Sequence, residues 1–348
     1  MSAPEITDVP TTSPGPKATK VLSDDAVFVD RLLNRGSTPD EVHLLAAATH
    51  RRLPTGYAEC RVAERREQKA IKEALPDGIT QRTPEWYSAR ENYVTASDFW
   101  TAAFGSDAAK KRFVAGKAGA GKPFLGSAAT RHGVKYEDVA RLLYEHDMGC
   151  AVREYGLLPH KTVEIMAASP DGVSDVGVCV EIKAPVSRTL ADVPPEYHAQ
   201  MQGQMEVAGL RFADFVVCRA AELEPAEFWP AFEAAFEAGY GYERYGAVGT
   251  AADGSHVHST PGASPAELRA WIQAAVPAAV TTHHVFDFRV TRLEHDPAFV
   301  ADMLRGLEET WAGVVAARAN PGLCAAASAV QPSLGFAFKN FSKSFKNG

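Results

Sequence analysis

The sequence predicts an α/β protein with a mixed central sheet and helices on its flanks. Helical periodicity marks residues 127–148 and 194–210, and Asp296 is placed to cap a further helix near the C-terminal end. Short apolar runs alternate with these helices and are predicted to be strands, at residues 178–184, 212–219 and 285–292. Helices and strands that alternate along one chain are typical of a sheet covered by helices.

The N-terminal part of the chain differs from this pattern. Residues 1–22 are rich in Pro, Ser and Thr, which is typical of a disordered leader. Residues 23–80 are predicted to be a helical N-terminal extension, because apolar residues recur there at helical spacing. Its third helix, residues 57–75, is rich in Arg and Lys. These side chains form either a solvated helix face, which composition favours, or a contact for a nucleic-acid backbone.

The predicted core comprises residues 81–220 and 283–320. It is interrupted by an Ala-, Gly- and Glu-rich segment, 221–282, which we interpret as a helical insertion. Residues 321–348 are predicted to be a flexible tail in which Phe alternates with Lys. Inside the core, residues 94–98 read as a helix start with Ser97 as its N-cap, and residues 110–122 read as a basic, mobile loop.

The composition is that of a globular protein, with 46% hydrophobic and 23% charged residues. A net charge of −7 does not point to a nucleic-acid binder, although carboxylates elsewhere can mask a local basic groove. Five scattered cysteines favour reduced thiols in an intracellular protein over a disulfide scaffold. The N-terminus lacks the apolar region of a signal peptide, and no run approaches the ~18 apolar residues of a membrane span. We therefore expect a protein that is neither secreted nor membrane-spanning.

The most informative motif is S-P-D-G at residues 169–172, followed by E-I-K at residues 181–183. Asp171 lies in a tight turn, and strand alternation sends Glu181 and Lys183 to one face while Ile182 points into the core. Two carboxylates beside an amine on a rigid sheet edge suit Mg²⁺ and an attacking water. The residues alone also fit an ordinary surface hairpin, so the motif has to be weighed with the rest of the chain.

Five motifs follow one another in the core: W-Y-S-A-R with T-A-S-D, then G-x₃-E, S-P-D-G, E-I-K and A-Q-M-Q. In this order they resemble the phage lambda-type exonucleases, or YqaJ-like viral recombinases, of the PD-(D/E)XK nuclease superfamily. The resemblance is close over residues 83–219 and continues through 285–320. It implies a restriction-endonuclease-like core within the predicted α/β fold.

The resemblance implies a metal site. Asp171 and Glu181 match the family's acidic metal ligands, the backbone carbonyl of Ile182 completes that side, and Glu137 matches the acidic residue that helps to hold the metals. Carboxylates gathered in one place repel one another strongly unless cations neutralise them. We therefore expect Mg²⁺, with Mn²⁺ as an alternative, and two ions ~3.5–4 Å apart.

The resemblance also assigns the remaining roles. Lys183 matches the lysine that orients or deprotonates the attacking water, and Gln200 matches the glutamine that supports this nucleophile. Arg90 matches the arginine that holds a 5′-terminal phosphate, and Ser97 matches the serine that assists it. A guanidinium offers a phosphate a planar fork that a lysine ammonium cannot reproduce.

Each assignment has a structural alternative. Glu137 could pair with Arg141 one helical turn away, and Arg90 could pair with Glu85 or Glu91. Ser97 could serve only as an N-cap. Gln200 could be a surface residue, since Gln202 and Gln204 confuse the assignment. Two histidine pairs suggest zinc, but neither has a matching ligand set, so we interpret both as incidental: His256 with His258, and His283 with His284.

The function implied by this resemblance is a Mg²⁺-dependent deoxyribonuclease, in particular a 5′→3′ exonuclease acting on the ends of double-stranded DNA in viral or phage recombination. The family also implies a toroidal trimer, a single-strand annealing protein as partner and, for a virus, action in the host cytoplasm or nucleus. Two alternatives stay open. One is an endonuclease or nickase on the same fold, and the other is a non-catalytic DNA-binding or scaffolding module.

Overall fold

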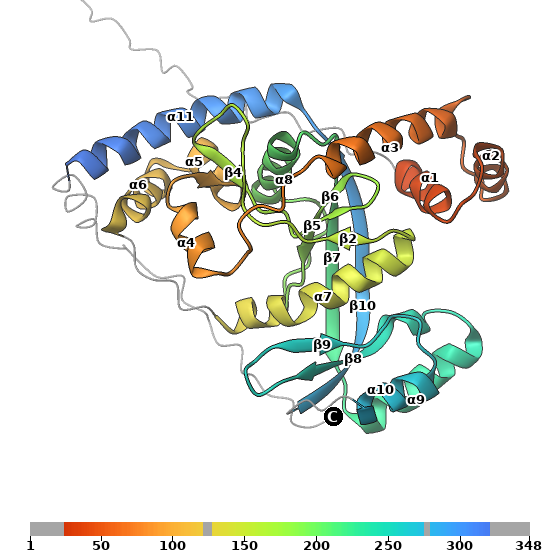
Figure 1. The fold of residues 1–348 in the computed structure, drawn as a ribbon. Coiled ribbons are helices and arrows are strands. Elements are labelled where there is room, and N and C mark those ends of the chain that lie inside the picture. The colour runs from red at the N-terminus through yellow and green to blue at the C-terminus, as the bar shows by residue number, and fades with distance from the viewer. Residues whose placement is uncertain (1–23, 121–126, 275–278, 321–348) are drawn as a thin grey trace, which may run out of the picture.

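The computed structural model describes residues 24–120, 127–274 and 279–320, so the predicted leader and tail lie outside the described residues. The main element is a seven-stranded sheet (Figure 1). Its strand order is β2 (Val152–Arg153), β5 (Gly172–Ser174), β6 (Val178–Lys183), β7 (Phe212–Glu222), β10 (Ala279–Glu294), β8 (Tyr245–Thr250) and β9 (His256–His258). A smaller sheet has the order β1 (Val94–Thr95), β4 (Met166–Ala168) and β3 (Leu158–Pro159).

The large sheet is mixed, as the sequence predicts. Strands β6 and β7 are parallel, whereas the other pairings in this sheet are antiparallel. Parallel neighbours need a crossover connection. Here the crossover contains α8 (Pro195–Ala208), which lies between β6 and β7 in the chain.

Helices cover both faces of the sheet. On one face, α7 (Ala128–Met148) buries apolar side chains against those of the even-numbered positions of β6 and β7: Val139 and Leu143 with Val180, Ile182 and Val216. On the other face, α8 packs against the odd-numbered positions: Met201 and Met205 with Cys179, Phe215 and Val217. Strand alternation explains why both sets are apolar, since each face meets a helix. The predicted α/β class is therefore confirmed.

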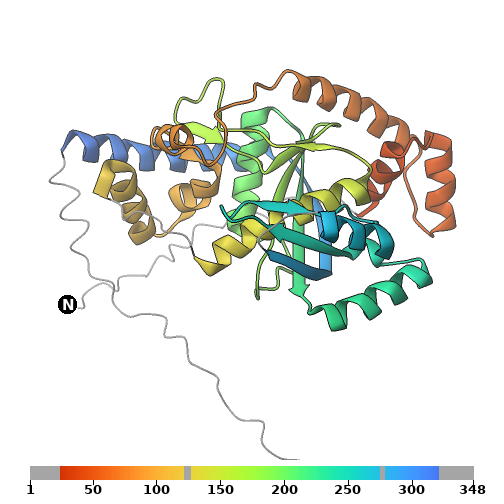
Figure 2. The same ribbon diagram turned by 60° about the horizontal axis from the view of Figure 1, so that its bottom comes forward.

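The N-terminal extension consists of the three predicted helices, α1 (Asp24–Asn34), α2 (Pro39–Ala48) and α3 (Tyr57–Glu73). They lie together at one side of the molecule (Figures 1 and 2). Helix α2 begins with a capping box, in which Thr38 and Glu41 satisfy each other's backbone N–H groups.

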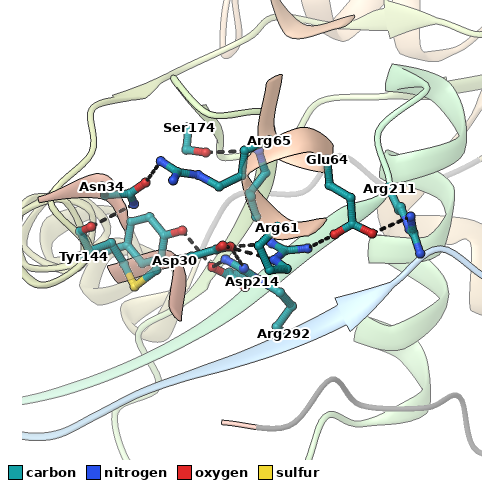
Figure 3. Close-up of polar contacts among 12 residues, drawn as sticks. Asp30, Asn34, Arg61, Glu64, Arg65, Tyr144, Ser174, Arg211, Asp214 and Arg292 are labelled. Carbon is teal, nitrogen blue, oxygen red and sulfur yellow. Dashed lines mark hydrogen bonds and ion pairs between the residues drawn. The ribbon is translucent and has the colours of Figure 1, made fainter. Parts of the chain in front are cut away.

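A buried ionic network joins this extension to the sheet (Figure 3). Arg292 on β10 donates to both carboxylate oxygens of Asp214 on β7, at 2.8 Å each, and also to Asp30 on α1. Arg61 on α3 donates to Asp30 at 2.6 Å. These four charged side chains are almost completely buried. The expectation for the cations of this helix, a solvated face or a nucleic-acid contact, is therefore wrong for Arg61, which is buried.

Helices α4 (Pro84–Arg90), α5 (Phe99–Phe104), α6 (Asp107–Ala115) and α11 (Pro297–Ala319) gather on the opposite side (Figure 1). Asp296 caps α11 by accepting from two backbone N–H groups at 3.0 Å, as predicted. The prediction of a mobile loop at 110–122 is wrong for its first part. Residues up to 115 belong to α6, which follows its N-cap Ser106. Among the described helices, none is long and apolar enough to cross a membrane.

The segment between β7 and β10 contains strands as well as helices, so the prediction of a purely helical insertion is corrected. Helices α9 (Pro225–Ala238) and α10 (Pro265–Ala274) bury a small core of their own with β8: Phe228, Phe232, Ala247 and Leu268. Strand β8 also pairs with the first part of β10, so that β8 and β9 extend the main sheet. The Ala- and Gly-rich composition concealed these strands, because neither residue favours β structure.

Candidate active site

The S-P-D-G segment forms the turn between β4 and β5. Two side chains from the start of the core hold this turn. Trp86 Nε1 donates to Ser169 Oγ at 3.0 Å, and Gln81 Nε2 donates to the backbone carbonyl of Pro170 at 3.0 Å. On the other side, the backbone N–H of Ile182 donates to Asp171 Oδ2 at 2.8 Å. The Asp171 carboxylate is therefore fixed between the turn and β6.

Glu181 lies at the centre of the site and is fully buried. It accepts hydrogen bonds from Lys183 Nζ and from Gln204 Nε2, the latter at 2.6 Å. A buried carboxylate needs such partners because water cannot solvate it. As the alternation of β6 predicts, Glu181 and Lys183 share one face while Ile182 is buried on the other.

Lys183 is held as a cation in this arrangement. Its Nζ lies 4.7 Å from the centre of the Tyr197 ring, whose face attracts positive charge. Burial alone would lower the pKa of Lys183, but the carboxylates of Glu181 and Asp171 outweigh it and raise the pKa above its ordinary value. The ammonium group therefore donates hydrogen bonds within the site.

Glu137 projects from α7 toward the same site. Arg82 Nη2 donates to both of its carboxylate oxygens, at 2.8 and 2.9 Å. The alternative pairing with Arg141 is wrong, because Arg141 binds Asp138 and Glu145 instead.

These side chains line a cleft of about 410 Å³. Its lining residues include Arg82, Glu137, Asp171, Lys183, Arg188 and Tyr197. Glu181 borders the cleft through its contact with Lys183. The structure thus brings together, around one cavity, four of the five side chains that the sequence assigned to metal binding and water activation.

The carboxylate oxygens at this cleft are the type of ligand that a hard divalent cation prefers. Burial first, and then the negative charges of Glu181 and Glu137, raise the pKa of Asp171 well above its ordinary value. This excess of negative charge is what an oxygen-bound cation would neutralise. The carboxylates are not arranged for an ion as they stand: within the described residues, no three His, Cys, Asp or Glu side chains form a ready metal cluster. Glu137 faces Arg82, and Glu181 faces Lys183 and Gln204. The ligand roles of Asp171, Glu181, Glu137 and the Ile182 carbonyl stay predictions.

A different glutamine from the one that the sequence indicated contacts Glu181, and the role of Gln200 stays a prediction. Gln200 is half-buried, whereas Gln204, one turn later on α8, is fully buried and contacts Glu181. The Gln204 amide oxygen has no hydrogen-bond partner in the described part of the chain, so it is available to a water. Gln202 has a structural role instead, since it binds the backbone of residues 294 and 296.

Arg90 and Ser97 lie together, as the sequence predicts. Arg90 Nη2 donates to Ser97 Oγ at 3.3 Å, and the guanidinium stacks on the Trp86 ring at 4.3 Å. No ion pair of Arg90 with Glu85 or Glu91 occurs in the described residues. Ser97 is not an N-cap: it lies inside a short 3₁₀ helix, Ala96–Asp98, and Asp98 precedes α5.

Other cations surround this pair and were missed by sequence reasoning. Lys117 Nζ donates to the Arg90 carbonyl at 2.8 Å and lies 3.7 Å from Asp98. Arg318, at the end of α11, donates to the carbonyl of Lys117 at 2.8 Å. Lys117 belongs to the basic run that we expected to be mobile, so composition gave no sign of this contact.

The histidine pairs lie away from the cleft. His256 contacts Thr250 at 3.1 Å, and His258 Nε2 lies 3.0 Å from the backbone carbonyl of Lys135. His283 is buried, and His284 stacks on the ring of Tyr245 at 4.3 Å. These contacts account for the four rings as packing residues.

Comparisons with solved structures identify two similar folds. The alkaline exonuclease of Laribacter hongkongensis is 22% identical, with a TM-score of 0.46, over 71% of this chain and 100% of that chain. A phage-related exonuclease of Haemophilus somnus is 12% identical, with a TM-score of 0.39, over 64% of this chain and 93% of that chain.

Sequence comparison is more specific. Protein R354 of Acanthamoeba polyphaga mimivirus is 30% identical over 192 residues, which is 49% of this chain. The match spans about a third of that relative, or 35% of its length. The family model of the YqaJ-like viral recombinase domain matches residues 85–211, which include every motif of the cleft and of the Arg90 pair. Residues 85–211 of this chain therefore resemble a YqaJ-like viral recombinase domain, as the order of the motifs indicated.

Proposed function

We propose that this chain is a Mg²⁺-dependent deoxyribonuclease that degrades double-stranded DNA from its ends in the 5′→3′ direction. One observation carries the proposal. Trp86 connects two chemically different places: its Nε1 holds the turn that bears Asp171, and its ring supports Arg90. A carboxylate-lined cleft with a lysine and a separate cluster of basic side chains at Arg90 are thereby fixed to each other.

The cleft suits the hydrolysis of a phosphodiester. Asp171, Glu181, Glu137 and the Ile182 carbonyl would hold Mg²⁺, which neutralises the phosphate and lowers the pKa of a bound water. The chain itself has to orient that water. Lys183 Nζ and Gln204 Nε2 both donate to Glu181, and the Gln204 amide oxygen has no hydrogen-bond partner within the described residues. Lys183 already donates a hydrogen bond to Glu181, so we assign it to orienting the water beside that carboxylate.

The basic cluster at Arg90 suits the end of a DNA strand. A terminal phosphate carries about −1.5 to −2 charges at neutral pH, whereas an internal phosphodiester carries one. Arg90 and Lys117 supply two cations and Ser97 supplies a hydroxyl, with Asp98 as the nearest anion. Burial lowers the pKa of both Arg90 and Lys117, because it disfavours their charged forms. A bound anion would offset this cost.

The viral relative R354 and the family that residues 85–211 resemble support a role in viral or phage recombination and DNA end processing. Such a role would bring the chain to the host cytoplasm or nucleus. By the same resemblance, we extend the proposal to a trimeric assembly and to a single-strand annealing protein as partner.

The proposal is tested by digestion of linear duplex DNA and closed circular DNA of the same sequence. The linear duplex carries a label at either the 5′ or the 3′ end, and each reaction is run with Mg²⁺ and with EDTA. We expect Mg²⁺-dependent loss of the linear duplex, early release of the 5′ label and an intact circle. A circle cut as fast as the linear duplex would favour an endonuclease, and no hydrolysis of either substrate would refute the nuclease assignment.

A further inference from the structure

Arg82 has an unusual backbone conformation for its residue type. Its φ is +64°, and within the described residues His50 is the other non-glycine residue with a positive φ. A side chain in this region of backbone space is strained, and such residues cluster at functional sites.

The flanking residues hold Arg82 in this conformation. Gln81 Nε2 donates to the backbone carbonyls of Tyr155 and Pro170, at 2.8 and 3.0 Å. Thr83 caps α4 and donates to the carbonyl of Thr80 at 2.9 Å. Pro170 precedes Asp171 directly, so the position of Arg82 relative to the cleft is fixed from both sides.

The guanidinium of Arg82 is only partly used. In the described part of the chain, its hydrogen bonds both leave from Nη2 and end on Glu137. The two side chains are 49% and 31% exposed, and an ion pair this open to water contributes little to the stability of the fold. Replacing Glu137 by another anion is therefore easy, and Nε and Nη1 remain free for a second contact.

We propose that Arg82 binds a phosphate of the DNA substrate in the cleft and that it exchanges Glu137 for that phosphate. This inference rests on the proposed nuclease function. A phosphate offers the guanidinium two oxygens at once, which the planar fork matches. The exchange also frees the Glu137 carboxylate for the cation that the cleft would hold. Arg82 thus couples substrate entry to the release of a carboxylate.

The test measures DNA affinity without turnover. A short duplex is titrated in EDTA at several salt concentrations with the wild type, Arg82→Gly and Arg82→Lys. Glycine removes the guanidinium and also relieves the positive φ, so Arg82→Gly is expected to unfold at or above the wild-type temperature. If Arg82 contacts a phosphate, the slope of log affinity against log salt falls by about one in Arg82→Gly, and affinity falls about tenfold. Arg82→Lys is expected to keep the slope and to lose affinity only in part.

Arg269→Ala is the matched control. Arg269 also forms an exposed ion pair, with Glu233 at 2.6 Å, but it lies on α10 in the insertion. This variant removes the same charge and should leave the slope unchanged. A second readout is Glu137→Gln, which should tighten DNA binding more in the wild type than in Arg82→Gly, because only the former has a guanidinium to release.

An unchanged slope in Arg82→Gly would overturn the inference, even if its turnover fell, since Arg82 would then act only by positioning Glu137. This result differs from a failure of the proposed function. If the wild type does not hydrolyse linear DNA with Mg²⁺, the function itself is wrong. If the wild type hydrolyses DNA and Arg82→Gly keeps its slope, only the role of Arg82 is wrong.

Discussion

At the scale of single residues, the fold holds the Asp171 carboxylate in a position where its charged form is unfavourable. Its pKa is raised by burial and by the charges of Glu181 and Glu137, so the folded state binds a proton there more tightly than the unfolded state does. A raised acid pKa destabilises the fold above that pKa, and the penalty disappears below the unfolded value near ~3.9. We therefore predict that Asp171→Asn raises the unfolding temperature at pH 7–8 in EDTA, and that this gain shrinks as the pH approaches 4. Differential scanning fluorimetry checks it.

The same variant separates metal binding from catalysis. A ligand that binds only the folded state stabilises it, so Mg²⁺ is expected to raise the wild-type unfolding temperature and to have little effect on Asp171→Asn. Hydrolysis should be lost in this variant. Asp302→Asn, at an exposed position on α11, is the control for the loss of one carboxylate. A Mg²⁺ shift as large in Asp171→Asn as in the wild type would exclude Asp171 as a ligand.

Arg90 leads to a prediction about DNA ends. If its guanidinium binds a terminal phosphate with Ser97, a duplex with a 5′-phosphate should be digested about tenfold faster than one with a 5′-hydroxyl, because charge-assisted contacts contribute roughly 1.5–3 kcal/mol. Arg90→Ala should remove this preference but keep the slow digestion of 5′-hydroxyl ends, and Arg90→Lys should restore it in part. Initial rates at fixed salt provide the measurement. Equal wild-type rates on both ends would contradict the 5′-end role.

Residues with a strong local pattern were predictable, and residues selected by geometry were not. Strand alternation placed Glu181 and Lys183 together because the period of a strand is fixed. On α8, Gln200 and Gln204 share one face, so sequence could not decide which of them reaches Glu181. A positive φ cannot be recognised from the sequence when the residue is an arginine, so the conformation of Arg82 could not be predicted.

At the scale of elements, α1 and α3 are attached to β7 and β10 by the buried network of Figure 3. Asp214 receives two hydrogen bonds from Arg292 and one from Tyr144 at 2.7 Å. Burial and the charge of Asp214 raise the pKa of Tyr144 far above its ordinary value, so the hydroxyl remains a donor. The long helices and the central strands β6, β7 and β10 were readable from periodicity, but this network was not, because Asp30 and Arg292 are 262 positions apart.

The network yields a stability prediction. Asp214→Ala leaves Arg292 buried with only Asp30, and loss of one partner of a buried pair costs about 3–5 kcal/mol. The partly exposed pair of Arg51 with Asp25, at 2.6 Å, is the control, so Asp25→Ala should change stability by about 1 kcal/mol or less. Urea unfolding of both variants checks the contrast. Equal effects would show that burial of the Asp214 pair does not determine its contribution.

At the scale of the whole molecule, extension, core and insertion share one apolar layer, and core and insertion also share one sheet. The layer on the α7 face includes Val27 from α1 and Val248 from β8. The boundaries that the sequence suggested, at residues 221 and 283, fall inside β7 and β10. The sequence predicted a separate insertion because the composition changes at these residues. Strand pairing does not follow this change: residues 283 and 284 of β10 pair with β7 on one side and with β8 on the other.

This continuity predicts that the insertion opens together with the core. In Asp214→Ala, hydrogen exchange of β8 amides should accelerate by about the same factor as that of β7 amides, on the order of a hundredfold or more if the loss is ~3 kcal/mol. Helix α10 provides the internal comparison, because it packs on the separate small core around Phe228 and Leu268 and can exchange locally. Exchange followed by mass spectrometry, at a pH where opening is in equilibrium, gives each factor. If β8 kept its wild-type exchange while β7 accelerated, the strand shared through β10 would not transmit stability, and the insertion would be an independent unit.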